Sequence, residues 1–217
     1  MILSKSIGYK NTNAFYVIIY LYRYIMEKII LITHQKGGVG KSTLTFNLAS
    51  NLKESAKVCI LDMDNQGSLL NISELSQVPV FTSDKLKKEY NFIFIDTPPY
   101  INERISELCQ IADIIIIPTK AEVLDLLAIK LTIDIIKDSK AEKKALIVFN
   151  MVKPKTTLTE EMKNEVKDYG IKVSKNMISD LVSFSSSILV NGVEDNNTAQ
   201  KQIDNLTKEI LTLTINQ

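Results

Sequence analysis

The chain has 217 residues, of which 45% are hydrophobic, and a formal net charge of +1. This length favours a single domain with a substantial buried core. The near-neutral charge gives no overall basic surface for nucleic acid or an anionic membrane. Cys59 and Cys109 are too few for a disulfide framework or a cysteine-built metal site, so both are predicted to be small core residues of a reduced protein.

The N-terminal residues are treated separately from the rest. Residues 1–25 are predicted to be an extension or a misassigned start, and residues 26–217 are predicted to form a single domain. Residues 14–22 are apolar, but Arg23 closes this run well short of the ~20 residues that a membrane span needs. A small-residue cleavage site is missing, so a secretory signal is not expected.

A predicted strand over residues 28–33 leads into the sequence KGGVGKST at residues 36–43. A helix is predicted after it, because leucines recur at helical spacing from Leu44 to Leu52. Strand, glycine-rich turn and helix is the context of a phosphate-binding loop, in which backbone N–H groups and the helix dipole face an anion. The chain is therefore predicted to bind a nucleoside triphosphate.

Individual residues of this loop have expected roles. Lys41 is predicted to reach the outer phosphates, and the Ser42 hydroxyl to hold Mg²⁺. The usual loop pattern has a glycine where this chain has Gln35, and a second lysine, Lys36, follows. His34 is the only histidine of the chain and is interpreted as incidental.

Two apolar runs farther along the chain end in aspartates. The first leads into DMDNQGS, which contains Asp62 and Asp64, and the second ends in DTPP, which begins at Asp96. A carboxylate at the C-terminal end of a strand suits Mg²⁺, which prefers oxygen ligands. Taken alone, each aspartate could equally be a turn residue or a helix cap.

The remaining chain alternates predicted strands and helices. Strands are predicted at residues 114–117, ending at Pro118, and at 145–149, ending at Asn150. A stripe of apolar residues predicts a helix after the first of these strands: Leu124, Leu127, Ala128, Leu131 and Ile135. Further helices are predicted at 158–168 and 200–213. This order predicts an α/β fold with a doubly wound, mostly parallel sheet and helices on both faces.

The three motifs together resemble the ParA/MinD family of ATPases, whose deviant Walker A phosphate-binding loop (P-loop) carries a second lysine. The match is closest to the compact plasmid-partition ParA proteins that lack an N-terminal helix-turn-helix domain. In that family the second lysine crosses a dimer interface to the partner's nucleotide. The resemblance implies catalytic roles for Lys36, Lys41 and Asp64; nucleotide binding by Gly37, Gly38, Val39, Gly40, Lys41, Ser42, Thr43, Pro118 and Asn150; and a metal shell of Ser42, Asp62 and Asp96.

The function implied by the resemblance is Mg²⁺-dependent ATP hydrolysis, slow without a partner, in a protein that segregates a plasmid or chromosome. Its expected partners are a second subunit in the presence of ATP, non-specific DNA and a centromere-binding ParB-like adaptor. A cytoplasmic, nucleoid-associated location is expected. The candidate DNA-binding residues are Lys153, Lys155, Lys172, Lys175 and Lys201.

Two alternatives stay open at this point. The first is a MinD-like positioning ATPase that acts on a membrane or a protein cargo. Residues 200–217 carry only two basic residues, Lys201 and Lys208, so membrane attachment there is not expected. The second is a metabolic ATPase of the same fold, such as an amidoligase or a metallocluster reductase. Lys36 and the Gln66-Gly67 pair favour the partition branch over this one.

Overall fold

The computed structural model describes residues 27–64, 67, 69–82, 90–100, 104–153 and 158–215. The predicted N-terminal extension, Gln66 and the DNA-binding candidate Lys155 lie outside these ranges. The described residues form one seven-stranded sheet with the strand order β3-β2-β4-β1-β5-β6-β7, and every paired strand is parallel to its neighbour. The strands are β1 Lys28–Ile32, β2 Val58–Asp62, β3 Val80–Phe81, β4 Phe92–Asp96, β5 Ile114–Thr119, β6 Ala145–Phe149 and β7 Lys172–Val173.

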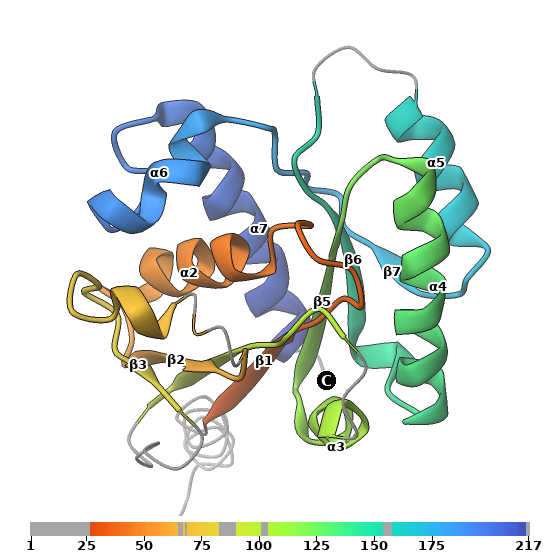
Figure 1. Cartoon of the computed structure of the whole chain (residues 1–217), viewed down its shortest axis with the longest axis horizontal. Coiled ribbons are helices and arrows are strands. Elements are labelled where there is room, and N and C mark those ends of the chain that lie inside the picture. Colours follow the sequence, from red (N-terminus) through yellow and green to blue (C-terminus); the bar gives the residue numbers. More distant parts are fainter. Residues whose placement is uncertain are drawn as a thin grey trace, which may run out of the picture.

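Helices cover both faces of this sheet, as Figure 1 shows, so the predicted doubly wound α/β fold is confirmed. One face packs against α2 (Lys41–Leu52), α6 (Val182–Val190) and α7 (Asn197–Ile215). The other packs against α3 (Arg104–Ile111), α4 (Val123–Asp138) and α5 (Leu158–Lys167). Two short 3₁₀ turns, η1 at Leu70–Ile72 and η2 at Glu142–Lys144, complete the described elements.

The central strands are continuous apolar runs because both of their faces are buried. Side chains alternate between the two faces of a strand. In β1, Ile30 and Ile32 belong to the core beneath α2, whereas Leu31 belongs to the core beneath α3 and α4. In β5 the same alternation separates Ile116 from Ile115. Both predicted small core residues, Cys59 and Cys109, are buried free thiols, which confirms that prediction.

Strand β5 is longer than predicted, because it continues through Pro118 to Thr119. Proline lacks an N–H and is tolerated in a strand where that side needs no ladder bond. The pairing of β5 with β1 ends at Ile116, so only β6 pairs with β5 at Pro118.

Helix α4 forms where predicted, but the stripe that predicted it is not its buried face. Leu124, Leu127 and Leu131 are 68%, 67% and 54% exposed. The buried residues of α4 include Asp125, Ile129, Thr132, Ile133 and Ile136. The spacing of the apolar residues correctly predicted a helix. However, α4 packs onto the sheet through a different stripe of residues, which includes the carboxylate of Asp125.

The order of the strands determines where a ligand can bind. The chain leaves β1 for β2 on one side of it, and later returns through β4 to β5 on its other side. Ligands of open parallel sheets bind at the C-terminal edge where the strand order reverses in this way. That edge carries the residues that follow β1, β2 and β4. None of the helices in the described ranges has the length and apolarity to cross a bilayer.

Candidate nucleotide-binding site

The glycine-rich loop joins β1 to α2 and has the backbone that a phosphate-binding loop requires. Gly38 and Gly40 have φ angles of 72° and 85°, and Gly40 is the residue immediately before α2. This left-handed region favours glycine. A Cβ atom at Gly40 would also overlap the side-chain amide of Asn150. Glycine is therefore required at this position both by the turn and by the close approach of Asn150.

Lys41 points back into this loop. Its side chain is only 7% exposed, and Nζ donates a hydrogen bond of 3.1 Å to the carbonyl of Lys36. Burial lowers the pKa of Lys41, while the charges of Asp96 and Asp64 act in the opposite direction. An ammonium held inside the loop beside two carboxylates is placed to meet phosphate oxygens.

Lys36 points in a different direction. Its Nζ lies 2.8 Å from Oδ2 of Asp125 on α4, so the side chain leaves its own loop. The start of the loop is held by two further contacts. The backbone N–H of Lys36 donates to Nδ1 of His34 at 2.9 Å, and the N–H of Gln35 donates to Thr132 Oγ1 on α4 at 3.1 Å.

The carboxylates of the two aspartate motifs meet at the sheet edge. Asp96 is in register with both Asp62 of β2 and Ile32 of β1, so the three strands end side by side. Asp96 is fully buried and accepts hydrogen bonds from Ser42 and, at 3.4 Å, from Thr45. Its Oδ2 has no hydrogen-bond partner among the described residues. Asp62 and Asp96, predicted from separate motifs, are thus brought together.

Asp96 and Asp62 nevertheless have different environments. The pKa of Asp96 is raised to about 7, mainly by burial and also by the charges of Asp62 and Asp64, against the Ser42 hydrogen bond and the Lys41 charge. Asp62 instead accepts backbone N–H groups from Asp64, Leu69 and Leu70 at 3.0–3.1 Å. Asp62 therefore organises the loop that follows β2.

The donor set at the sheet edge fits Mg²⁺, which binds through one or two carboxylates together with phosphates and waters. Asp96, with one unpartnered buried oxygen, and the adjacent Ser42 hydroxyl are best placed to hold it. Asp62 stays a predicted ligand whose two oxygens already accept backbone N–H groups.

Asn150 lies beside the loop, and its role toward adenine stays a prediction. Its Nδ2 donates to the carbonyl of Val39 at 2.8 Å. It also lines a pocket with Thr43, Ile178 and Phe184. Sequence reasoning missed the last two residues, because they come from the loop after β7 and from α6. Pro118 lies within β5 and does not line this pocket, so its assignment to the adenine site stays a prediction.

The interpretation of His34 as incidental is wrong. The side chain is fully buried, and its Nδ1 accepts the N–H of Lys36. Burial lowers the pKa of His34 to about 4, with contributions from Lys41 and Lys36, against the charge of Asp125. A neutral imidazole therefore shapes the start of the loop. The signal in the sequence was a lone histidine two residues before a loop lysine.

We expect His34→Asn to remove part of the protein's sensitivity to acid. The native pKa of about 4 is below the ordinary value of 6.5, so the unfolded chain takes up a proton first as the pH falls. The stability contributed by neutral His34 is present above pH 6.5 and is lost as the pH falls toward 4. Urea unfolding should show that the wild type loses roughly 2 kcal/mol between pH 6.5 and 5 through this residue, and the variant does not.

The asparagine oxygen can still accept the Lys36 N–H, whereas leucine cannot. The control His34→Leu is therefore expected to be less stable than His34→Asn at every pH. Wild type and His34→Asn with parallel pH profiles would contradict this role of His34.

A two-lysine phosphate-binding loop at the reversal point of a parallel sheet, with buried carboxylates at the adjoining strand ends, defines a nucleotide-binding domain of the deviant P-loop class. Residues 30–192 match the family described as "CobQ/CobB/MinD/ParA nucleotide binding domain". This match covers more than half of the chain, and the chain belongs to this family. It is of the compact, ParA-like kind.

Named relatives and solved structures agree with this assignment. The chain is 30% identical over 165 residues to the "Maintenance of carboxysome distribution protein A" of Halothiobacillus neapolitanus, covering 66% of this chain and 76% of that protein. It resembles in fold a putative plasmid partition protein from Borrelia burgdorferi bound to AMPPNP, with a TM-score of 0.68, 20% identity, and 86% and 99% of the two chains covered. An ATP complex of an Asp-to-Ala variant of Cyanothece McdA gives a TM-score of 0.72 at 15% identity, covering 86% and 96%.

Proposed function

We propose that this protein is a Mg²⁺-dependent ATPase that pairs with a second copy when ATP is bound, binds DNA without sequence preference, and moves a plasmid or chromosome. Hydrolysis is slow in the separated subunit and is stimulated by a centromere-binding, ParB-like adaptor. The proposed location is cytoplasmic, in association with the nucleoid. The family membership and the geometry of the loop support this proposal.

The proposal rests mainly on one observation: the side chains of the two loop lysines point in different directions. Lys41 is buried in its own loop, while the Lys36 ammonium reaches away from it to α4. A lysine in a phosphate-binding loop that does not face its own phosphate site fits a residue that serves a second subunit's nucleotide. Such a cation stabilises the charge that develops during phosphoryl transfer.

The other site residues have complementary proposed roles. Lys41 neutralises charge on the phosphates, and Asp96 with Ser42 holds the metal ion, which supplies further neutralisation when bound. Asp64 lies close enough to act on the charges of Lys41 and Asp96, and we assign it to orienting the attacking water. Phosphoryl transfer depends mostly on such positioning, so an incomplete site is slow.

DNA binding is assigned to a groove between the edge of the sheet and α7. Two predicted candidates, Lys172 and Lys175, line it together with Lys208. All three side chains are exposed, and none forms an ion pair within the described ranges. The carboxylate of Glu209 also lines the groove but accepts hydrogen bonds from Ser174 and Asn176. The candidates Lys153 and Lys201 are exposed but lie outside this groove.

Binding to random-sequence duplex DNA tests this proposal. It should be measured across a salt series with ATP and Mg²⁺, with ADP, and without nucleotide. We expect binding only with ATP, weakening steeply with salt as phosphate contacts do. Replacing Lys172, Lys175 and Lys208 together by glutamine should lower the magnitude of the salt slope by about one for each lysine that contacts a phosphate.

The matched control replaces three exposed lysines outside the groove, Lys130, Lys137 and Lys143, by glutamine, and is expected to bind like the wild type. Equal losses in the two triple variants would contradict the groove as the DNA site. If the wild type forms a dimer in the presence of ATP but binds no DNA, positioning of a protein or membrane cargo becomes the better-supported function. The similarity to a carboxysome-distribution protein makes this the second candidate function.

A further inference from the structure

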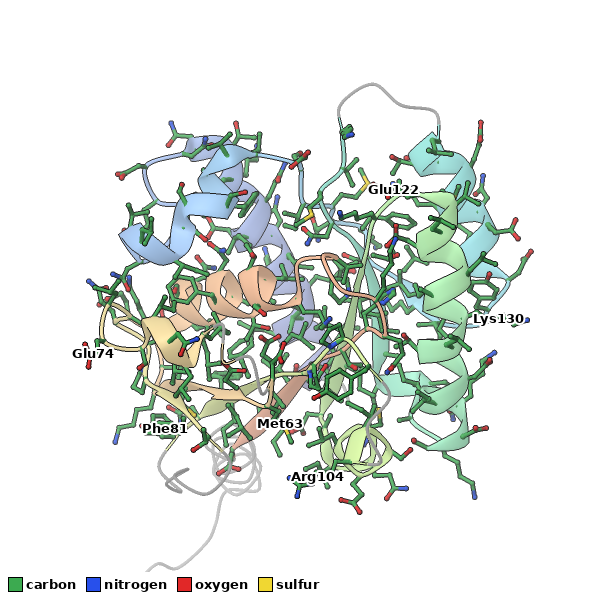
Figure 2. The ribbon with its side chains drawn as sticks, in the orientation of Figure 1. Met63, Glu74, Phe81, Arg104, Glu122 and Lys130 are labelled. Carbon is green, nitrogen blue, oxygen red and sulfur yellow. The ribbon has the colours of Figure 1, made fainter. Side chains whose placement is uncertain are left out.

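Asp125 is a buried carboxylate near the start of α4. In this part of the helix the usual pattern is reversed, because leucines are exposed and a charged residue is buried. Figure 2 shows Glu122 where α4 begins and Lys130 projecting from its outer side. Leu124 and Leu127 of this helix are about two-thirds exposed, whereas the Asp125 side chain has no exposed surface. A helix seldom buries a carboxylate while exposing its leucines, because an ionised group is costly to remove from water.

The compensating charge comes from the phosphate-binding loop. Oδ2 of Asp125 accepts the Lys36 ammonium at 2.8 Å, and Lys36 itself remains 32% exposed. Oδ1 of Asp125 has no hydrogen-bond partner in the described part of the chain. Lys36 is the only cation whose ion pair with Asp125 the described residues show. The buried member of the pair therefore depends on the exposed member.

This asymmetry makes the departure of Lys36 unfavourable. If the ammonium leaves for another partner, Asp125 stays buried without a counter-charge, and removing one member of a buried pair is strongly destabilising. The Asp125 carboxylate has no exposed surface, so it depends on Lys36 for its counter-charge. The loop and α4 are also tied through the Gln35 N–H and Thr132 Oγ1, which helps to keep Lys36 beside Asp125.

We propose that Asp125 is a latch that retains Lys36 within its own subunit and so opposes pairing of subunits until bound nucleotide outweighs it. Asp125 is a positioning residue that acts through Lys36. This inference rests on the proposed function, in which Lys36 must reach the nucleotide of a second copy.

The test compares the wild type with Asp125→Asn, which keeps the shape and a hydrogen-bond acceptor but removes the charge. Sedimentation velocity across a range of protein concentrations, with AMPPNP and Mg²⁺, gives the dissociation constant of the dimer. We expect at least about tenfold tighter pairing in Asp125→Asn, because Lys36 then leaves no uncompensated charge behind. An equal or weaker dimer in the variant, with a wild type that pairs normally, would overturn the latch alone.

A second measurement examines the ion pair without any nucleotide. Lys36→Met should lower the melting temperature by several degrees, because it leaves the buried Asp125 carboxylate without a counter-charge. Adding Asp125→Asn should recover most of the lost melting temperature. Restoration together with unchanged pairing would show a purely structural pair and would overturn the latch. Failure of all variants and the wild type to pair with AMPPNP would overturn the proposed function, and the latch with it.

Discussion

Lys36→Ala is expected to leave nucleotide binding nearly unchanged while lowering ATP turnover at least about 100-fold and abolishing ATP-dependent pairing. The reason lies in the separate directions of the two loop lysines. Within its own loop, Lys36 contributes its backbone carbonyl to the Lys41 ammonium and its N–H to His34, and alanine keeps both. Titration with a fluorescent ATP analogue, light scattering and phosphate release would measure the three properties separately.

Two controls sharpen this comparison. Lys41→Ala removes the ammonium inside the loop and should lose nucleotide binding itself. Lys36→Ala also strands the buried Asp125 carboxylate, so the measurements should be repeated with Asp125→Asn added, in a variant without an uncompensated charge. Normal light scattering with ATP in either Lys36 variant would rule out a role for this lysine between subunits.

Asp96→Asn is expected to stabilise the nucleotide-free protein at pH 8 while weakening its Mg²⁺-dependent binding of AMPPNP at least about tenfold. The native pKa of about 7 lies above the ordinary 3.8. Between these values the native protein keeps a proton that the unfolded chain has released. The favourable contribution of Asp96 is therefore complete below pH 3.8 and is lost as the pH rises through 7.

Unfolding in urea at pH 5 and pH 8 would measure this effect. Between these two pH values the wild type should lose roughly 3 kcal/mol through Asp96 as an upper bound, and the asparagine variant should not show this loss. Wild-type binding of Mg²⁺·AMPPNP should also tighten from pH 6 to pH 8, because the metal ion needs the ionised carboxylate.

The neighbouring carboxylate provides the matched control. Asp62 accepts three backbone N–H groups, so Asp62→Asn places an amide group against a donor and should be destabilising by about 1–3 kcal/mol at both pH values. Equal changes in stability in Asp96→Asn and Asp62→Asn would contradict the assignment of Asp96 to metal binding and of Asp62 to organising the loop.

Much of the fold could be predicted from the sequence, because each central strand of a parallel sheet is a local apolar run. The strands β1, β2, β4 and β6 lie where those runs predicted them. The short elements were not predicted: β3 and β7 have two residues each, and four of the nine residues of α6 are serines. Segments this short carry too little periodicity to be distinguished from loops.

The phosphate-binding loop and the aspartates at the strand ends could also be predicted, because each is formed by residues adjacent in sequence. The spacing of such residues largely determines their arrangement in space. His34 and Asp125 could not, because their importance arises from contacts with other elements. A lone histidine carries no periodic signal, and Asp125 lies outside the leucine stripe that predicted the buried face of α4.

The sequence by itself thus determined the parallel α/β class, the position of the loop and the family, all of which depend on local patterns of residues. Only the tertiary structure decided which of those residues meet. It brought Asn150 to Val39 across 111 positions and Asp125 to Lys36 across 89. It also gathered Lys172, Lys175 and Lys208 along one groove. The physical reason is that burial and ion pairing depend on how helices pack onto the sheet, and no local pattern specifies which side of α4 turns inward.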